Sequence, residues 1–252
     1  RDEIGMSAVN SINWARVVAQ VVYYFTAAVA VGAPDRKVSF AVPTGNFGCV
    51  FAGYVAVQMG LPVDKLIVAT NRNDILHRFF QTGSYRKDKV FATQSPSMDI
   101  QVASNFERLL FDLAGRDSVI VREDMVKLTN QGGFEVSSAA INQARTLFLS
   151  HRVDEEATTR TIGEVYGATG IIIDPHTAVG LRAAHDLMPD GPVIALATAH
   201  PAKFPDAVEN ACGVRPTLPD QMADLYEREE RFATLPNNQA ALQDYIRGMR
   251  RA

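Results

Sequence analysis

A loop at residues 43–48 has the residue types that bind an anion through main-chain N–H groups. Its sequence, PTGNFG, lies between an apolar run at residues 37–42 and another at residues 49–59. Between a buried strand and a helix, such a loop lets successive N–H groups converge on a phosphate, and the helix dipole adds favourable charge. The loop is neither a Walker motif nor GxGxxG, so a tight turn without a ligand explains it equally well when it is taken alone.

Three further polar segments follow apolar runs, at residues 70–74, 174–177 and 198–203. In an open parallel sheet, ligands bind outside the carboxyl ends of the strands, so these segments and the 43–48 loop should converge on one edge. Each segment has a structural explanation by itself, as a helix cap, a turn or a strand-end hydroxyl. Taken together, they predict a binding site.

The spacing of the reactive side chains does not favour a metal site or a hydrolase. His176 and His200 fall in the predicted site loops, but no pair of histidines or cysteines has the spacing of a zinc site. No GxSxG elbow is present for a Ser-His-Asp triad. Cys49 follows the glycine loop and is better explained as a small buried residue than as a reactive thiol. We therefore expect no metal.

Strand and helix patterns alternate in the segments that would position these loops. Continuous apolar runs predict strands buried on both faces of a parallel sheet, and a helix at residues 49–59 would connect the first two. The predicted strands are residues 37–42, 66–70, 170–173 and 193–197. The predicted helices are residues 17–33, 103–114, 123–130, 137–150, 154–169, 220–232 and 238–251. The sequence thus predicts an α/β fold, with the first helix buried.

Composition excludes several classes of protein. Of the 252 residues, 47% are hydrophobic and 21% are charged, which is typical of a globular chain with a sizeable core. With a net charge of -3, no basic patch for nucleic acid is predicted. The apolar stretch at residues 17–33 is about as short as a membrane span can be and contains polar residues, so we expect no membrane association. Two isolated cysteines favour a reducing, cytoplasmic location.

Six segments, in the same order, resemble threonine synthase, a pyridoxal-phosphate enzyme of threonine biosynthesis in the aspartate family of amino acids. They are residues 10–16 (NSINWAR), 42–48 (VPTGNFG), 69–74 (ATNRND), 95–100 (SPSMDI), 174–180 (DPHTAVG) and 197–204 (ATAHPAKF). The resemblance implies the type II fold of pyridoxal-phosphate enzymes, with a three-layer parallel-sheet core and a mostly helical inserted subdomain. It also implies a lyase that converts O-phosphohomoserine and water into threonine and phosphate.

The resemblance implies four parts along the chain and a role for individual residues. Residues 1–74 would begin the cofactor-binding α/β domain, 75–169 would form the helical insert, 170–212 would return to the α/β domain, and 213–252 would form C-terminal helices. The implied cofactor-phosphate ligands are the main chains of Gly45, Asn46, Phe47 and Gly48, and Thr198 would offer its hydroxyl to the pyridine nitrogen. The implied ligands of the substrate phosphate are Ser11, Asn13 and Arg16, with Lys203 and His200 as weaker candidates.

One departure from the family decides what this chain is expected to do. The Schiff-base lysine of the family lies in a segment upstream of the stretch that matches residues 10–16, and no lysine here has that context. The lysines are Lys37, Lys65, Lys87, Lys89, Lys127 and Lys203. We therefore expect a C-terminal fragment or a processed chain, starting without methionine at Arg1, with no catalytic residue of its own and no activity alone. Cys49 is a second departure, since the family usually has a polar or acidic residue there.

Two alternative functions and one question about the cofactor stay open at this stage. The parent protein could be another type II pyridoxal-phosphate enzyme, such as a threonine or serine dehydratase or a tryptophan-synthase-like enzyme. The chain could instead be an anion-binding module without catalysis. Whether the fragment retains pyridoxal phosphate is also open. A small-molecule substrate is the expected partner, and sheet edges left exposed in a fragment would favour self-association.

Overall fold

The computed structural model describes residues 4–5 and 10–249. The chain forms two compact units, of which the larger comprises Ser11–Pro216 and the smaller comprises Arg1–Asn10 with Thr217–Ala252. Every strand of the described chain lies in the larger unit, and so does the candidate site.

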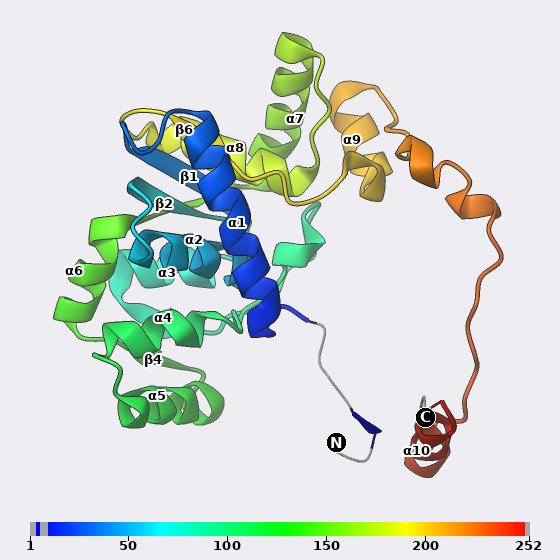
Figure 1. Cartoon of the computed structure of the whole chain (residues 1–252), viewed down its shortest axis with the longest axis horizontal. Helices are drawn as coiled ribbons and strands as arrows, with labels where there is room; N and C mark the ends of the chain where they lie inside the picture. Colours follow the sequence, from blue (N-terminus) through cyan, green and yellow to red (C-terminus); the bar gives the residue numbers. More distant parts are fainter. Residues whose placement is uncertain (1–3, 6–9, 250–252) are drawn as a thin grey trace. The chain divides into compact units, whose positions relative to one another are not determined.

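A parallel four-stranded sheet forms the centre of the larger unit (Figure 1). The strand order is β5-β2-β1-β6. The strands are β1 (Val38–Pro43), β2 (Val63–Thr70), β5 (Phe148–Arg152) and β6 (Val193–Ala195). All residues of β1 are buried, as the continuous apolar run predicts for a central strand. The predicted parallel pairing of the first two strands, with a helix between them, is confirmed.

Helices cover both faces of this sheet and complete three layers. The helices of the larger unit are α1 (Trp14–Ala30), α2 (Gly48–Gln58), α3 (Ile75–Thr82), α4 (Phe106–Leu113), α5 (Ser118–Gln131), α6 (Ser138–Leu147), α7 (Glu155–Thr169), α8 (Pro175–Leu187) and α9 (Pro205–Cys212). Because successive side chains of a strand point to opposite faces, Phe40 and Val42 pack with α1 to α6, whereas Ala41 packs with α7 and α8. Small side chains on this second face let α8 lie close to the sheet.

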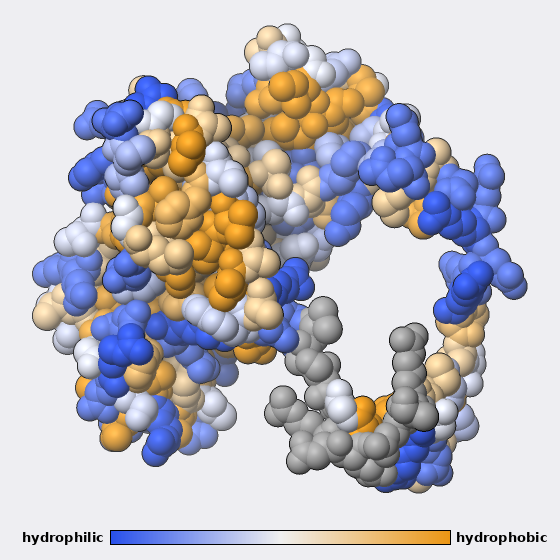
Figure 2. All heavy atoms as spheres, viewed as in Figure 1, coloured by the Kyte–Doolittle hydropathy of each residue, from blue (hydrophilic) through white to orange (hydrophobic). Residues whose placement is uncertain are grey.

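Close packing against α2 positions α1 over the sheet. A Cβ at Gly53 would lie 2.7 Å from the ring of Tyr24, so only glycine permits this approach. The Tyr24 hydroxyl also donates to the Cys49 carbonyl at 2.7 Å. The opposite face of α1 is exposed and apolar, with Val22 at 62% and Val29 at 61% exposure (Figure 2). The prediction of a buried helix is therefore correct for one face only.

Three of the predicted elements are wrong. Residues 148–150, predicted as the end of a helix, belong to β5, which lies beside β2. Residues 170–173 form no strand, and Ile171 is 60% exposed. Residues 220–232 contain only two short 3₁₀ helices, Asp220–Met222 and Leu225–Glu227. The segment is highly charged and buries no side chain that could stabilise a longer helix.

The sequence patterns also missed α3 and a small antiparallel sheet. The latter pairs β3 (Ser84–Arg86) with β4 (Gly133–Glu135). The predicted division of the chain into four parts stays a prediction, although β5 lies within the segment predicted as the helical insert. In the smaller unit, α10 (Gln239–Gly248) begins after Asn238, whose side chain accepts the Ala241 N–H. Across the described ranges, no helix is both long and apolar enough to cross a bilayer.

Candidate functional site

A pocket of about 300 Å³ lies where β1 and β6 end. The chain leaves β1 through α2 on one face of the sheet and reaches β6 from α8 on the other face, so these neighbouring strands form a topological switch point. Ligands of parallel α/β folds bind at such points. Eight of the ten predicted binding residues line the pocket: Ser11, Arg16, Gly45, Asn46, Phe47, Gly48, Thr198 and Lys203.

The loop from Gly45 to Gly48 presents main-chain N–H groups to this pocket. Phe47 has a left-handed backbone (φ 63°, ψ 5°), which is uncommon for a residue other than glycine. Its buried ring packs edge to face on Phe106, with ring centroids 5.2 Å apart, and this packing holds the backbone. No main-chain or side-chain acceptor in the described chain receives the N–H groups of residues 45–50. These six donors at the start of α2 can therefore bind an anion.

A turn at residues 95–99 closes the pocket against the loop. It contains a 3₁₀ helix (Pro96–Met98), and Ser97 and Met98 line the pocket. A Cβ at Gly45 would clash with the Ser97 carbonyl oxygen, so the turn can approach the loop only because residue 45 is glycine. Residues 95–100 form one of the six segments that resemble threonine synthase, but no role was predicted for this turn, because it follows no predicted strand.

Buried amides after β2 hold this turn in place. Asn71 donates to Ser95 Oγ at 2.9 Å and to Asp99 Oδ1 at 2.8 Å. Asn73 donates to the same Asp99 oxygen at 2.9 Å. Both asparagines are buried, and the 70–74 segment does not line the pocket. The predicted convergence of this segment on the site is thus indirect, because its side chains bind the turn rather than the pocket.

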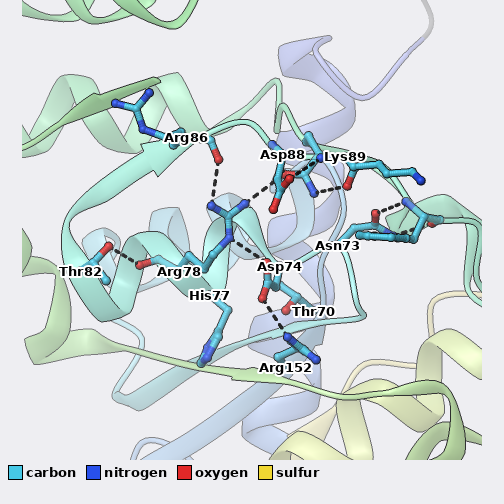
Figure 3. A network of polar contacts seen from close by, with 12 residues as sticks. Thr70, Asn73, Asp74, His77, Arg78, Thr82, Arg86, Asp88, Lys89 and Arg152 are labelled. Atoms are coloured by element: carbon cyan, nitrogen blue, oxygen red, sulfur yellow. Dashed lines mark hydrogen bonds and ion pairs between the residues drawn. The ribbon is translucent and has the colours of Figure 1, made fainter. Parts of the chain in front are cut away.

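A second network extends the same segment towards β3 (Figure 3). Asp74 accepts from Arg78 at 2.8 Å and from Arg152 at 3.5 Å. Arg78 also donates to the Arg86 carbonyl at 3.0 Å and to Gln101 at 3.2 Å. Asp74 thus binds arginines from α3 and β5, and Arg78 also connects α3 to β3 and to the chain after it. Polar contacts as well as the apolar core therefore hold this region in place.

At the floor of the pocket, His176 and Asp174 form a buried pair at the start of α8. Asp174 accepts from His176 Nδ1 at 2.9 Å, and His176 Nε2 accepts the Ser97 N–H at 3.3 Å. Burial alone would raise the pKa of Asp174, but hydrogen bonds from His176 and Thr177 outweigh it and hold that pKa below its ordinary value. The imidazole therefore carries its proton on Nδ1 and supports the 95–99 turn.

Two cations lie at the edge of the pocket. Arg16 on α1 and Lys203 in the 3₁₀ helix Pro201–Lys203 are both exposed, and neither forms an ion pair with the described residues. The Thr198 hydroxyl also lines the pocket and forms no hydrogen bond within the described chain. The two cations thus place positive charge at this edge of the pocket, beside the N–H groups of the loop.

Two predicted residues have other contacts. Asn13 is the N-cap of α1 and accepts the Ala15 N–H at 2.9 Å, and it does not line the pocket. His200 caps a 3₁₀ helix by accepting the Ala202 N–H at 3.2 Å. Their predicted contact with substrate stays a prediction. Within the described ranges, no group of three or more His, Cys, Asp or Glu side chains is placed to hold a metal ion.

Relatives of known identity match nearly the whole length of this chain. A family profile for the C-terminal region of threonine synthase matches residues 177–246. The threonine synthase of Pseudomonas aeruginosa is 55% identical over 242 residues, which are 95% of this chain and 52% of that protein. The enzyme of Corynebacterium glutamicum is 44% identical over 250 residues, or 96% of this chain and 52% of that protein.

Solved structures agree with these sequence matches. A PLP-bound threonine synthase from Brucella melitensis matches with a TM-score of 0.95 and 52% identity, covering 100% of this chain and 54% of that one. The yeast threonine synthase has a TM-score of 0.83 and 44% identity, covering 89% and 50%. The fold is therefore the type II fold of pyridoxal-phosphate enzymes. Within that class, the chain belongs to the threonine synthase family, and it spans about half the length of the curated relatives it matches.

Proposed function

We propose that this chain supplies the cofactor-phosphate site and part of the substrate site of a threonine synthase, which converts O-phosphohomoserine and water into threonine and phosphate. One observation carries the proposal: the unpaired N–H groups after Gly45 and the cations Arg16 and Lys203 face one pocket. A reaction with a phosphorylated cofactor and a phosphorylated substrate needs two anion sites side by side. A dehydratase, whose substrate has no phosphate, needs only the first.

The residues of the loop fit the phosphate of pyridoxal phosphate. Its N–H donors are unpaired, and the close approach of Ser97 to Gly45 narrows the space beside them. Thr198, with a hydroxyl free of other partners in the described chain, would donate to the pyridine nitrogen. When bound, the cofactor delocalises negative charge that develops next to the amino nitrogen of the substrate.

Ser11, Arg16 and Lys203 would hold the phosphate of the substrate. The guanidinium of Arg16 presents paired donors that match two phosphate oxygens, and Lys203 adds a point charge. Fixed donors at this position would also stabilise the leaving phosphate as its charge grows. Asn13 caps α1 through its amide oxygen, so its Nδ2 group would be the donor to the phosphate.

We further propose that the 252-residue chain is inactive alone. Of its six lysines, all of which lie in the described ranges, only Lys203 lines the pocket. Lys203 belongs to the predicted phosphate site and not to the segment that carries the Schiff-base lysine in the family. Borohydride treatment of the chain with pyridoxal phosphate should therefore leave no single lysine labelled stoichiometrically. A stoichiometric label on one lysine would contradict the proposed inactivity.

The substrate assignment is tested by replacing Arg16 in a full-length threonine synthase that contains this chain. Arg16→Ala should lower kcat/KM for O-phosphohomoserine by about 100-fold, because one charge-assisted bidentate contact contributes about 1.5–3 kcal/mol. Arg122→Ala, which removes an exposed arginine outside the pocket, is the matched control and should have no effect. An unchanged kcat/KM in Arg16→Ala would remove Arg16 from the site. If the unaltered enzyme dehydrates threonine faster than it converts O-phosphohomoserine, the dehydratase alternative is favoured.

A further inference from the structure

Asn105 occupies the N-cap position of α4 but does not cap that helix. Asparagine is favoured at this position because its side chain usually accepts an N–H from the first turn. In this chain, Asn105 makes no such bond, although it is fully buried. A buried side chain that leaves the contact its position favours has partners elsewhere.

Those partners are the two segments that form the predicted anion sites. Asn105 Nδ2 donates to the Ser11 carbonyl at 2.8 Å and to the Asn46 carbonyl at 3.2 Å. The Asn105 main-chain N–H donates to the same Asn46 carbonyl at 3.0 Å. Arg108 Nε completes the contacts by donating to Asn105 Oδ1 at 3.2 Å. Both amide hydrogens and the amide oxygen of Asn105 are therefore used.

The Asn46 carbonyl and the Phe47 N–H belong to one planar peptide, in which the two groups point in opposite directions. Two donors from Asn105 hold the carbonyl on the side away from the pocket. The Phe47 N–H is thereby held on the pocket side, with no partner in the described chain. A rotation of this peptide would replace that donor with a carbonyl oxygen, which repels an anion.

The contact between Asn105 and the Ser11 carbonyl links the segment around Ser11 to the 45–48 loop. Ser11 lines the pocket, and its carbonyl oxygen accepts the hydrogen bond from Asn105 Nδ2. Arg108 also donates to the next carbonyl, that of Ile12, at 2.8 Å. Gly48 lies between these groups, since a Cβ there would be 3.4 Å from Asn105 Nδ2 and 3.8 Å from the Ser11 oxygen. One buried amide therefore fixes the distance between the two anion sites.

We propose that Asn105 is a positioning residue, which orients the phosphate-binding N–H groups of the 45–48 loop and holds Ser11 beside them. The inference rests on the proposed phosphate site at that loop. Asn105 touches neither ligand and acts through the main chain of Asn46 and Ser11.

The test measures inorganic phosphate binding to the full 252-residue chain by titration of its amide NMR signals. Asn105→Asp keeps the volume and the acceptor for Arg108 but removes both Nδ2 donors, whereas Asn105→Ala removes the whole side chain. Both variants should weaken phosphate binding fivefold or more and abolish the phosphate-induced shift of the Phe47 amide signal. Ile141→Ala, a buried substitution on α6, is the control for lost stability: it should lower Tm and leave phosphate affinity within twofold.

Weakening of less than fivefold in both Asn105 variants would overturn the inference, and so would an equal loss in Ile141→Ala. These outcomes differ from failure of the proposed function. If the unaltered chain does not bind phosphate at the 45–48 loop, the proposed site fails and the inference fails with it. If the unaltered chain binds and the Asn105 variants bind equally well, only the inference fails.

Discussion

The loop at residues 45–48 depends on one close contact and one unusual backbone conformation. Gly45 lies against the Ser97 carbonyl, and Phe47 is left-handed with its ring buried. Phosphate donors that must converge on one point need such fixed geometry, because a mobile loop would lose entropy on binding. The loop and the other polar segments at the same sheet edge together predicted an anion site, but the contact of the loop with residue 97 was not predictable from sequence.

At this scale, Gly45→Ala should disturb the loop. The added Cβ would clash with the Ser97 oxygen, so either the turn or the loop must move, at a cost of about 1–3 kcal/mol in the free energy of unfolding. Phosphate affinity should fall about tenfold, measured by calorimetric titration. Gly167→Ala, on α7 with open space around its Cβ, is the matched control and should stabilise the chain by up to about 1 kcal/mol. If Gly45→Ala and Gly167→Ala have the same free energy of unfolding and the same phosphate affinity, the close contact between Gly45 and Ser97 is unimportant.

The buried Asp174 gives a prediction about pH. Its folded-state pKa is lowered, so the unfolded chain takes up the proton first as pH falls, and the contribution of the carboxylate to stability is lost on the acid side. Asp174→Asn should therefore lower the free energy of unfolding by about 2 kcal/mol at neutral pH, and by progressively less below the ordinary Asp pKa of about 3.9. Urea denaturation of both proteins across this range measures the difference. Asp220→Asn, at an exposed position, should leave the pH dependence unchanged, and a pH-independent effect of Asp174→Asn would contradict the assignment.

At the scale of elements, the central strands and most helices were predictable because their apolar patterns are long. Strand β1 is buried along its whole length, and α2 follows it with almost uniformly apolar residues. The first three residues of β5 were predicted as a helix end because β5 has only five residues and follows α6 directly. Its pairing with β2 is a long-range contact that no local pattern contains. Conversely, the apolar run at 170–173 resembles a strand, but it pairs with no strand of either sheet in the described chain.

The 95–99 turn gives the prediction for this scale. Asn71 donates to Thr93, Ser95 and Asp99 and accepts the main-chain N–H of Asn73. Asn71→Ala would remove these contacts and leave the buried Asn73 N–H without its acceptor. We expect a loss of about 3 kcal/mol in the free energy of unfolding, because each unpaired buried group costs about 1–3 kcal/mol. Amide hydrogen exchange should also become faster at residues 95–99. Asn130→Ala, exposed on α5, is the control, and unchanged exchange in Asn71→Ala would mean that other contacts hold the turn.

At the scale of the whole molecule, the pocket combines residues that are far apart in sequence. Ser11, Gly45, Ser97, His176 and Thr198 all line it. The rule for parallel sheets predicted that the loops after β1 and β6 would meet, and they do. The same rule could not show that the 70–74 segment acts on the turn instead, because that depends on side-chain contacts of Asn71 and Asn73.

The most direct test of the account compares pyridoxal phosphate with pyridoxal, which lacks the phosphate, in titrations of the unaltered 252-residue chain followed by amide NMR signals. Since the N–H groups of residues 45–50 have no partner in the described chain, their signals should shift with pyridoxal phosphate and stay in place with pyridoxal. Shifts of equal size with both compounds, or shifts confined to other parts of the chain, would contradict a phosphate site at this loop.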